Sequence, residues 1–190
     1  FLDWSQTSPQ DRAAYLQKLL DVYIARNDEI GAVISTEMGA PIDMAVRDQA
    51  GSGSSHLKAF IRALGSMEFQ RALRPGIEGQ DIAYEAAGVA GLITPWNWPM
   101  NQVVLKVGAA LAAGCTMVLK PSEIAPLSSV VFAEMVHEAG FPPGVFNMVN
   151  GDGVGVGSVL SSHPGIDVVS FTGSTRAGIL ISKAAADTVK

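Results

Sequence analysis

Residues 89–99 read VAGLITPWNWP and join a short apolar run to a stiff turn. The run VAGLIT has the length and apolar character of a buried β-strand, and the turn begins at Pro95. A proline fixes its own φ and restricts the residue before it, so Pro95 and Pro99 limit the conformations of the residues between them. The turn therefore holds Asn97 between two tryptophans, which suggests that the position of this one amide matters.

The pattern of an apolar run followed by a helical segment recurs through the rest of the chain. The sequence predicts strands at 89–94, 116–119, 145–149 and 166–171, and helices at 100–113, 126–139, 153–162 and 174–188. Strands that alternate with helices at this spacing indicate right-handed crossovers and a parallel sheet. The predicted fold class is α/β, a Rossmann-like open parallel sheet with helices on both faces.

The chain before Gly88 reads differently. Ser8 and Pro9 have the character of a helix start, and helices are predicted over 8–28, 28–36 and 41–64. Residues 68–87 contain turn residues between two short segments and predict a β-hairpin. The predicted organisation is therefore a helical part at 1–67, a hairpin at 68–87 and the parallel-sheet core at 88–190.

Composition excludes several classes of partner. Lys and Arg total 13 against 18 Asp and Glu, and this net charge of −5 argues against binding to nucleic acid or an anionic membrane surface. The longest nearly apolar run, 107–119, is too short for a bilayer, and the start FLDWSQ lacks the features of a secretory signal. The single cysteine, Cys115, cannot form an internal disulfide, and we expect a cytoplasmic protein. The chain lacks an initiator Met, so we expect it to be a piece of a longer protein.

Unusual residues follow every predicted strand. The four segments are TPWNWP (94–99), LKPSE (119–123), NGDGVGVG (150–157) and FTGSTRAG (171–178). In an open parallel sheet the carboxyl ends of the strands border one crevice, where ligands bind. Any one of these loops could merely turn the chain, but four in succession favour a binding site.

Two of these loops suit parts of a nucleotide. Gly173 and Ser174 open a helix, whose first N–H groups and positive end favour a phosphate. Ile179 stands where a P-loop requires Lys, and no register gives the G-x-G-x-x-G fingerprint. Lys120 and Glu123 suit ribose hydroxyls, and a carboxylate repels a 2′-phosphate, which favours NAD while Lys120 leaves NADP open.

Other chemistries have little support. His56, His137 and His163 are far apart in sequence and form no H-x-x-x-H, so no metal site is predicted and surface roles are favoured. The chain has no G-x-S-x-G motif of a serine hydrolase. Asp152 has the chemistry of an acid or base, but a turn role is the default for an Asp between glycines.

The segments TPWNWP, LKPSE, AGFPPGVFNMVNG and SFTGSTRAG together resemble the aldehyde dehydrogenase superfamily. The resemblance runs from about Trp4 to the last residue, and the motifs keep the order and spacing of that family; Trp98 stands where many members have another aromatic. It implies that Asn97 is the side-chain half of an oxyanion hole, which would explain its rigid turn. It also implies a proton-relay role for Lys106, for which contact with solvent or a carboxylate is an equal alternative.

The resemblance further implies a cofactor site for NAD, with NADP possible. It assigns Ile93, Thr94, Pro95 and Trp96 to the nicotinamide-ribose side, Lys120, Ser122 and Glu123 to the adenosine ribose, Gly153, Val154 and Gly157 to the adenine, and Phe171, Thr172, Gly173 and Ser174 to the diphosphate. Residues 1–67 would be the helical part of the cofactor-binding domain. The segment 68–87 would be a protruding oligomerisation hairpin, so a homodimer or homotetramer is expected of the full-length protein.

The implied activity is NAD(P)-dependent oxidation of an aldehyde to a carboxylic acid through a cysteine thioester. The family's nucleophilic Cys and general-base Glu would lie beyond Lys190, so the catalytic thiol domain is absent from this chain and the fragment alone is predicted to be inactive. Cys115 is expected to be a small buried residue on the opposite edge of the sheet. Two alternatives stay open, a non-catalytic nucleotide-binding module and a member that acylates coenzyme A or reduces an acyl phosphate, and the sequence does not name the aldehyde.

Overall fold

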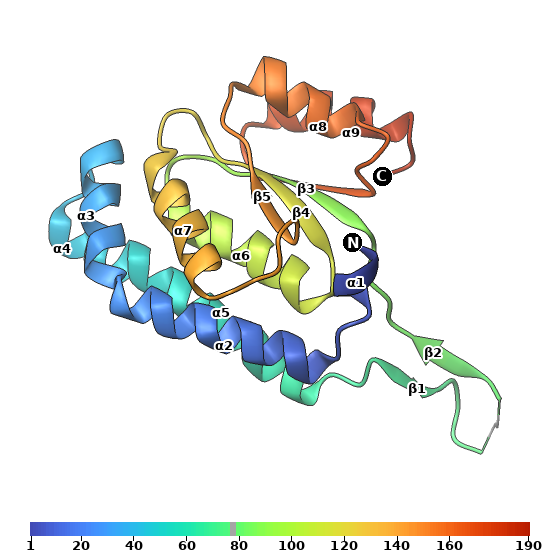
Figure 1. Cartoon of the computed structure of the whole chain (residues 1–190). Helices are drawn as coiled ribbons and strands as arrows, with labels where there is room; N and C mark the ends of the chain where they lie inside the picture. Colours follow the sequence, from blue (N-terminus) through green and yellow to red (C-terminus); the bar gives the residue numbers. More distant parts are fainter. Residues whose placement is uncertain (77–78) are drawn as a thin grey trace.

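The computed structural model describes residues 1–76 and 79–190, and it has a parallel sheet between two layers of helices (Figure 1). Residues 77–78, in the turn of the predicted hairpin, lie outside the described residues. The sheet has four parallel strands, helices cover both of its faces, and a two-stranded antiparallel pair projects from the body. The predicted fold class is confirmed.

The strand order of the parallel sheet is β5-β4-β3-β6. The strands are β3 (Val89–Ile93), β4 (Thr116–Lys120), β5 (Phe146–Met148) and β6 (Val168–Phe171). The chain moves outward from β3 to β4 and β5, then crosses back to place β6 on the other side of β3. This reversal creates a switch point between β3 and β6, the position where open α/β sheets bind ligands.

The two faces of the sheet carry different helices. Helices α6 (Pro99–Ala112) and α7 (Leu127–Glu138) lie on one face, and α8 (Ser158–Ser162) and α9 (Thr175–Ala186) lie on the other (Figure 1). The predicted helix at 153–162 begins as a π-helical turn, η2 (Gly153–Gly157), before it becomes α8. Fully buried apolar side chains such as Val103, Val107 and Met117 fill the space between α6 and the strands.

A further helical layer packs outside α6 and α7. It contains α2 (Pro9–Ala25), α3 (Asn27–Met38), α4 (Ile42–Met44), the π-helical η1 (Ala45–Ala50) and α5 (Gly51–Ser66). The short helix α1 (Leu2–Ser5) lies instead beside the amino end of the sheet (Figure 1). The Ser8 hydroxyl caps α2 as predicted, accepting from the Asp11 N–H at 3.0 Å, and Gly39 ends α3 with a φ of 76°. Because an added Cβ at Gly53 would collide with the Tyr23 ring, this glycine allows α5 to pack closely on α2.

One acidic side chain joins the outer layer to the sheet-covering layer. Glu37, at the end of α3, accepts hydrogen bonds from the backbone N–H groups of Leu127 at 2.5 Å and Ser128 at 3.1 Å. These N–H groups open α7 and have no partner within their own helix, so Glu37 serves as its N-terminal cap.

The antiparallel pair is β1 (Gln70–Ala72) with β2 (Asp81–Ala83), with Arg71 opposite Ile82. It extends away from the body of the molecule, and most of its residues are exposed (Figure 1). Within residues 1–76 and 79–190, no helix combines the length and hydropathy needed to cross a bilayer.

Candidate functional site

The loops that follow the four parallel strands leave the sheet at the same edge. Ile93, the last residue of β3, lies opposite both Lys120 and Phe171, the last residues of β4 and β6. Backbone hydrogen bonds continue one residue further, from Thr94 N to Lys120 O at 3.3 Å and from Thr172 N to Ile93 O at 3.1 Å. The loops after β3 and β6 therefore begin beside one another at the switch point, and the loops after β4 and β5 follow along the same edge of the sheet.

The loop after β3 is fixed by its backbone and leaves Asn97 exposed. Thr94 is buried, and its hydroxyl has no hydrogen-bond partner among the described residues. Pro95 is half-buried and Trp96 is 45% exposed. The loop ends where α6 begins at Pro99. Because the Asn97 side chain makes no hydrogen bond within the described part of the chain, its amide is available to another group.

Lys106 lies two turns into α6 and reaches across to β6. Its Nζ donates to the Ser170 hydroxyl at 2.8 Å, and burial lowers the pKa of Lys106. Both side chains line a cavity of about 360 Å³ that also includes Leu105 and Cys115. The partner of Lys106 is thus a hydroxyl, and no sequence motif pointed to Ser170.

The loop after β4 holds a buried lysine and a half-exposed carboxylate as a pair. Lys120 is 2% exposed, and its Nζ donates to Glu123 Oε2 at 2.7 Å. The hydrogen bond from Lys120 is the main reason that the pKa of Glu123 is lowered. Hydrogen bonds from the backbone N–H groups of Glu123 and Gly153 lower this pKa further. Ser122 is buried, and its hydroxyl accepts from the Ile124 N–H at 3.3 Å. Lys120 therefore orients Glu123, and the Glu123 carboxylate is the group that faces solvent.

The loop after β5 lies next to this pair, because the backbone N–H of Gly153 donates to the Glu123 carboxylate. Asp152 accepts from the Gly155 N–H at 2.7 Å and so caps η2, which supports its turn role. Gly153 is exposed, Val154 is 84% exposed, and Gly157 is buried. The exposed Val154 follows Gly153, whose backbone N–H donates to the Glu123 carboxylate.

The loop after β6 ends at the N-terminus of α9. The Ser174 hydroxyl caps the helix, accepting from the Ala177 N–H at 3.3 Å. The N–H groups of Thr175 and Arg176 precede the first intrahelical bond, which makes them donors for an anion. An added Cβ at Gly173 would lie 2.5 Å from the Phe171 ring, so this glycine is also required for close packing.

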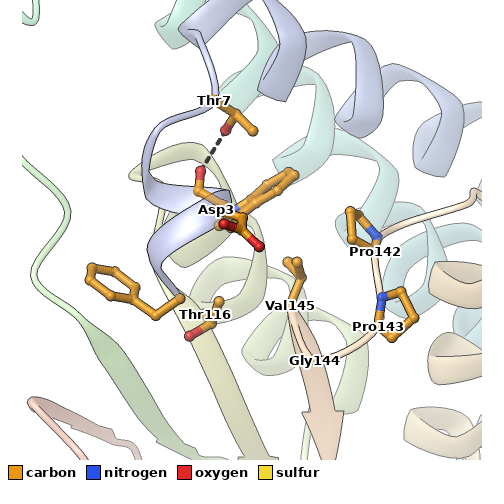
Figure 2. Close-up of a pocket in the computed structure, with 9 residues that line it drawn as sticks. Asp3, Thr7, Thr116, Pro142, Pro143, Gly144 and Val145 are labelled. Carbon is orange, nitrogen blue, oxygen red and sulfur yellow. Dashed lines mark hydrogen bonds between the residues drawn. The ribbon is translucent and has the colours of Figure 1, made fainter.

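The opposite edge of the sheet has a smaller cavity, of about 210 Å³ (Figure 2). Its lining includes Thr116, which begins β4, and Val145, which precedes β5, together with Asp3 and Pro142. Cys115 is buried next to Thr116, as expected. No group of three or more metal-ligating side chains occurs within residues 1–76 and 79–190.

A model of the aldehyde dehydrogenase family matches residues 1–190 of this chain. The chain belongs to the aldehyde dehydrogenase family. It is 51% identical over 191 residues to 3-succinoylsemialdehyde-pyridine dehydrogenase from a Pseudomonas species, and the match covers all of this chain. The chain spans only 39% of the length of that relative.

Solved aldehyde dehydrogenases have the same fold as this family member. The enzyme from Bartonella henselae superposes with a TM-score of 0.97 at 58% identity, over 98% of this chain and 39% of its own. A mutant of aldehyde dehydrogenase C from Pseudomonas syringae, in complex with NAD⁺ and octanal, superposes with a TM-score of 0.96 at 48% identity. That match covers 100% of this chain and 38% of the Pseudomonas syringae enzyme.

Proposed function

We propose that this chain is the N-terminal, cofactor-binding portion of an NAD-dependent aldehyde dehydrogenase that oxidises an aldehyde to a carboxylic acid. The observation that carries the proposal is the meeting of four strand-end loops at one sheet edge. The Pseudomonas syringae relative, in complex with NAD⁺ and octanal, supports both the cofactor and the substrate class.

The residues at this edge fit the parts of NAD. The N–H groups at the start of α9, with Phe171, Thr172, Gly173 and Ser174, would hold the diphosphate. Glu123, oriented by Lys120 beside Ser122, would accept hydrogen bonds from the adenosine-ribose hydroxyls, and its charge disfavours the 2′-phosphate of NADP.

The remaining contacts lie at the two ends of the cofactor. Gly153, the exposed Val154 and Gly157 would flank the adenine. The loop residues Ile93, Thr94, Pro95 and Trp96 would line the nicotinamide-ribose side. Bound there, NAD supplies the acceptor for the hydride that leaves the aldehyde.

Asn97 would act on the aldehyde itself. When a thiolate adds to the aldehyde carbon, negative charge develops on the oxygen, and an amide N–H already in place stabilises it without reorganisation. The thiolate would come from a cysteine elsewhere in the full-length protein, because Cys115 is buried at the opposite edge. Lys106 would relay a proton: burial lowers its pKa, and its Nζ donates to the Ser170 hydroxyl on β6.

The domain roles follow from this proposal. Residues 1–67 and 88–190 would form the cofactor-binding domain, and the exposed hairpin at 68–87 would pair subunits of a homodimer or homotetramer. The full-length protein would act in the cytoplasm.

The test is turnover of the full-length protein with NAD⁺ and a panel of aliphatic and aromatic aldehydes. NADH formation with release of the free acid is expected. An acyl-CoA or acyl-phosphate product would assign the chain to the other chemistries of the superfamily, and NAD binding without turnover would make it a binding module. The 190-residue chain alone should give no turnover; activity that disappears in Cys115→Ser would overturn the assignment of Cys115.

A further inference from the structure

We propose that His56 is a positioning residue for the oxidation reaction, because it fixes the helix turn that follows Asn97. The proposal rests on the role given to Asn97 under the proposed function. It concerns a histidine for which the sequence favoured a surface role.

The contact joins two segments that are distant in sequence. His56 Nε2 lies 2.7 Å from Asn101 Oδ1, and both side chains are partly buried. His56 belongs to α5, and Asn101 lies in the first turn of α6, four residues after Asn97. With Asn101 Oδ1 as the acceptor, His56 Nε2 is the donor and carries the hydrogen.

This hydrogen bond is the nearest side-chain restraint on the Asn97 loop. Among the described residues, no other side-chain hydrogen bond involves any residue from 94 to 105. The other restraints are the two prolines and backbone bonds, including those from Thr94 N to Lys120 O and from Gln102 N to Trp98 O. In the part of the chain that the structure describes, loss of the His56 bond would therefore leave the junction between the loop and α6 without a side-chain hydrogen bond to the helical layer.

The close packing of α5 on α6 lets this hydrogen bond restrain the first turn of α6. Further along both helices, an added Cβ at Gly108 would lie 2.6 Å from the Phe60 ring, so the two helices are in close contact there. His56 and Asn101 hold the same pair of helices at their earlier turns. Phe60 and Gly108 thus set the separation of the helices, while His56 and Asn101 set the position of the turn next to Asn97.

The functional effect of His56 would be on the rate of the chemical step. An oxyanion donor acts through its position, and loss of one such donor costs about 10²–10³ in rate. A displaced but present donor costs less, so we expect a fall of about tenfold in kcat when His56 is replaced by Leu. The KM for NAD should change little, because most cofactor contacts lie in the other three loops and the start of this loop is held by backbone hydrogen bonds of Thr94 to Lys120 and of Thr172 to Ile93.

The experiment uses four variants of the full-length protein, His56→Leu, His56→Gln, Asn101→Leu and the double variant His56→Leu/Asn101→Leu. Steady-state kinetics are combined with hydrogen exchange of the backbone N–H groups within residues 97–103, where every residue except Pro99 has one. We expect lower kcat and faster exchange in His56→Leu and Asn101→Leu, with no further loss in the double variant. His56→Gln should recover most of the activity, because its amide N–H can donate to Asn101.

Two results would overturn the proposal. One is wild-type exchange at residues 97–103 in His56→Leu. The other is a change confined to the aldehyde KM, which would mean that the pair contacts substrate and does not position Asn97. If the wild-type protein oxidises no aldehyde, the proposed function fails, but the exchange comparison still decides whether His56 fixes this turn.

Discussion

At the scale of single residues, the proposed preference for NAD depends on the carboxylate of Glu123. Lys120 is buried and directs its ammonium group to Glu123, so one charged group is left facing solvent. The sequence identified both residues and their suitability for a ribose. It did not show that the Lys120 ammonium group donates to Glu123. That contact depends on the burial of Lys120, which the sequence of a strand end does not reveal.

We predict that Glu123→Ser in the full-length protein shifts cofactor preference toward NADP. The substitution removes the charge that repels a 2′-phosphate and the acceptor for the ribose hydroxyls, so the ratio of kcat/KM for NAD to that for NADP should fall by about tenfold or more. The control is Asp43→Ser, an exposed acidic residue in α4, which should keep the wild-type ratio. An unchanged ratio in Glu123→Ser would remove the reason for assigning NAD from this residue.

Other residue contacts had no signal in the sequence. Lys106 meets Ser170 and His56 meets Asn101 across 64 and 45 positions of the chain, respectively. No local motif predicts such pairs, since they arise when helices and strands from different parts of the chain pack together. The candidate Asn97, in contrast, could be identified from the two prolines around it.

At the scale of elements, local sequence signals predicted most helices and strands but not their internal geometry. Ser8 and Gly39 mark a helix start and a helix end as expected. The π-helical turns η1 and η2 were not predicted, because their hydrogen-bond pattern depends on packing and not on residue type. The first helical turn of α7 is likewise capped by a residue from another helix, Glu37.

We predict that Glu37→Ala lowers the stability of the protein by about 1 kcal/mol, the usual cost of losing an N-terminal cap. Glu37→Gln should lose less, because one amide oxygen still accepts from the first turn of α7. Thermal unfolding monitored by circular dichroism measures the effect, and Asp43→Ala serves as an exposed control. Equal melting temperatures for Glu37→Ala and wild type would show that the cap contributes nothing.

At the scale of the whole molecule, the proposed cofactor site depends on the order of the strands. The sequence predicted that the strand ends share an edge, since parallel strands joined by helices require it. It did not give the order β5-β4-β3-β6, which brings the loops after β3 and β6 together at the switch point. Strand order depends on which apolar faces pack against each other, and that packing joins segments distant in the chain.

The central claim is that one NAD molecule contacts all four loops at the carboxyl edge. The most direct measurement is hydrogen exchange of the full-length protein with and without NAD⁺, followed by mass spectrometry. We predict that NAD⁺ slows exchange together in residues 94–98, 121–124, 152–157 and 172–176, and leaves the hairpin and the opposite edge near Thr116 and Val145 unchanged. Protection of a single loop, or protection at the opposite edge, would contradict the claim.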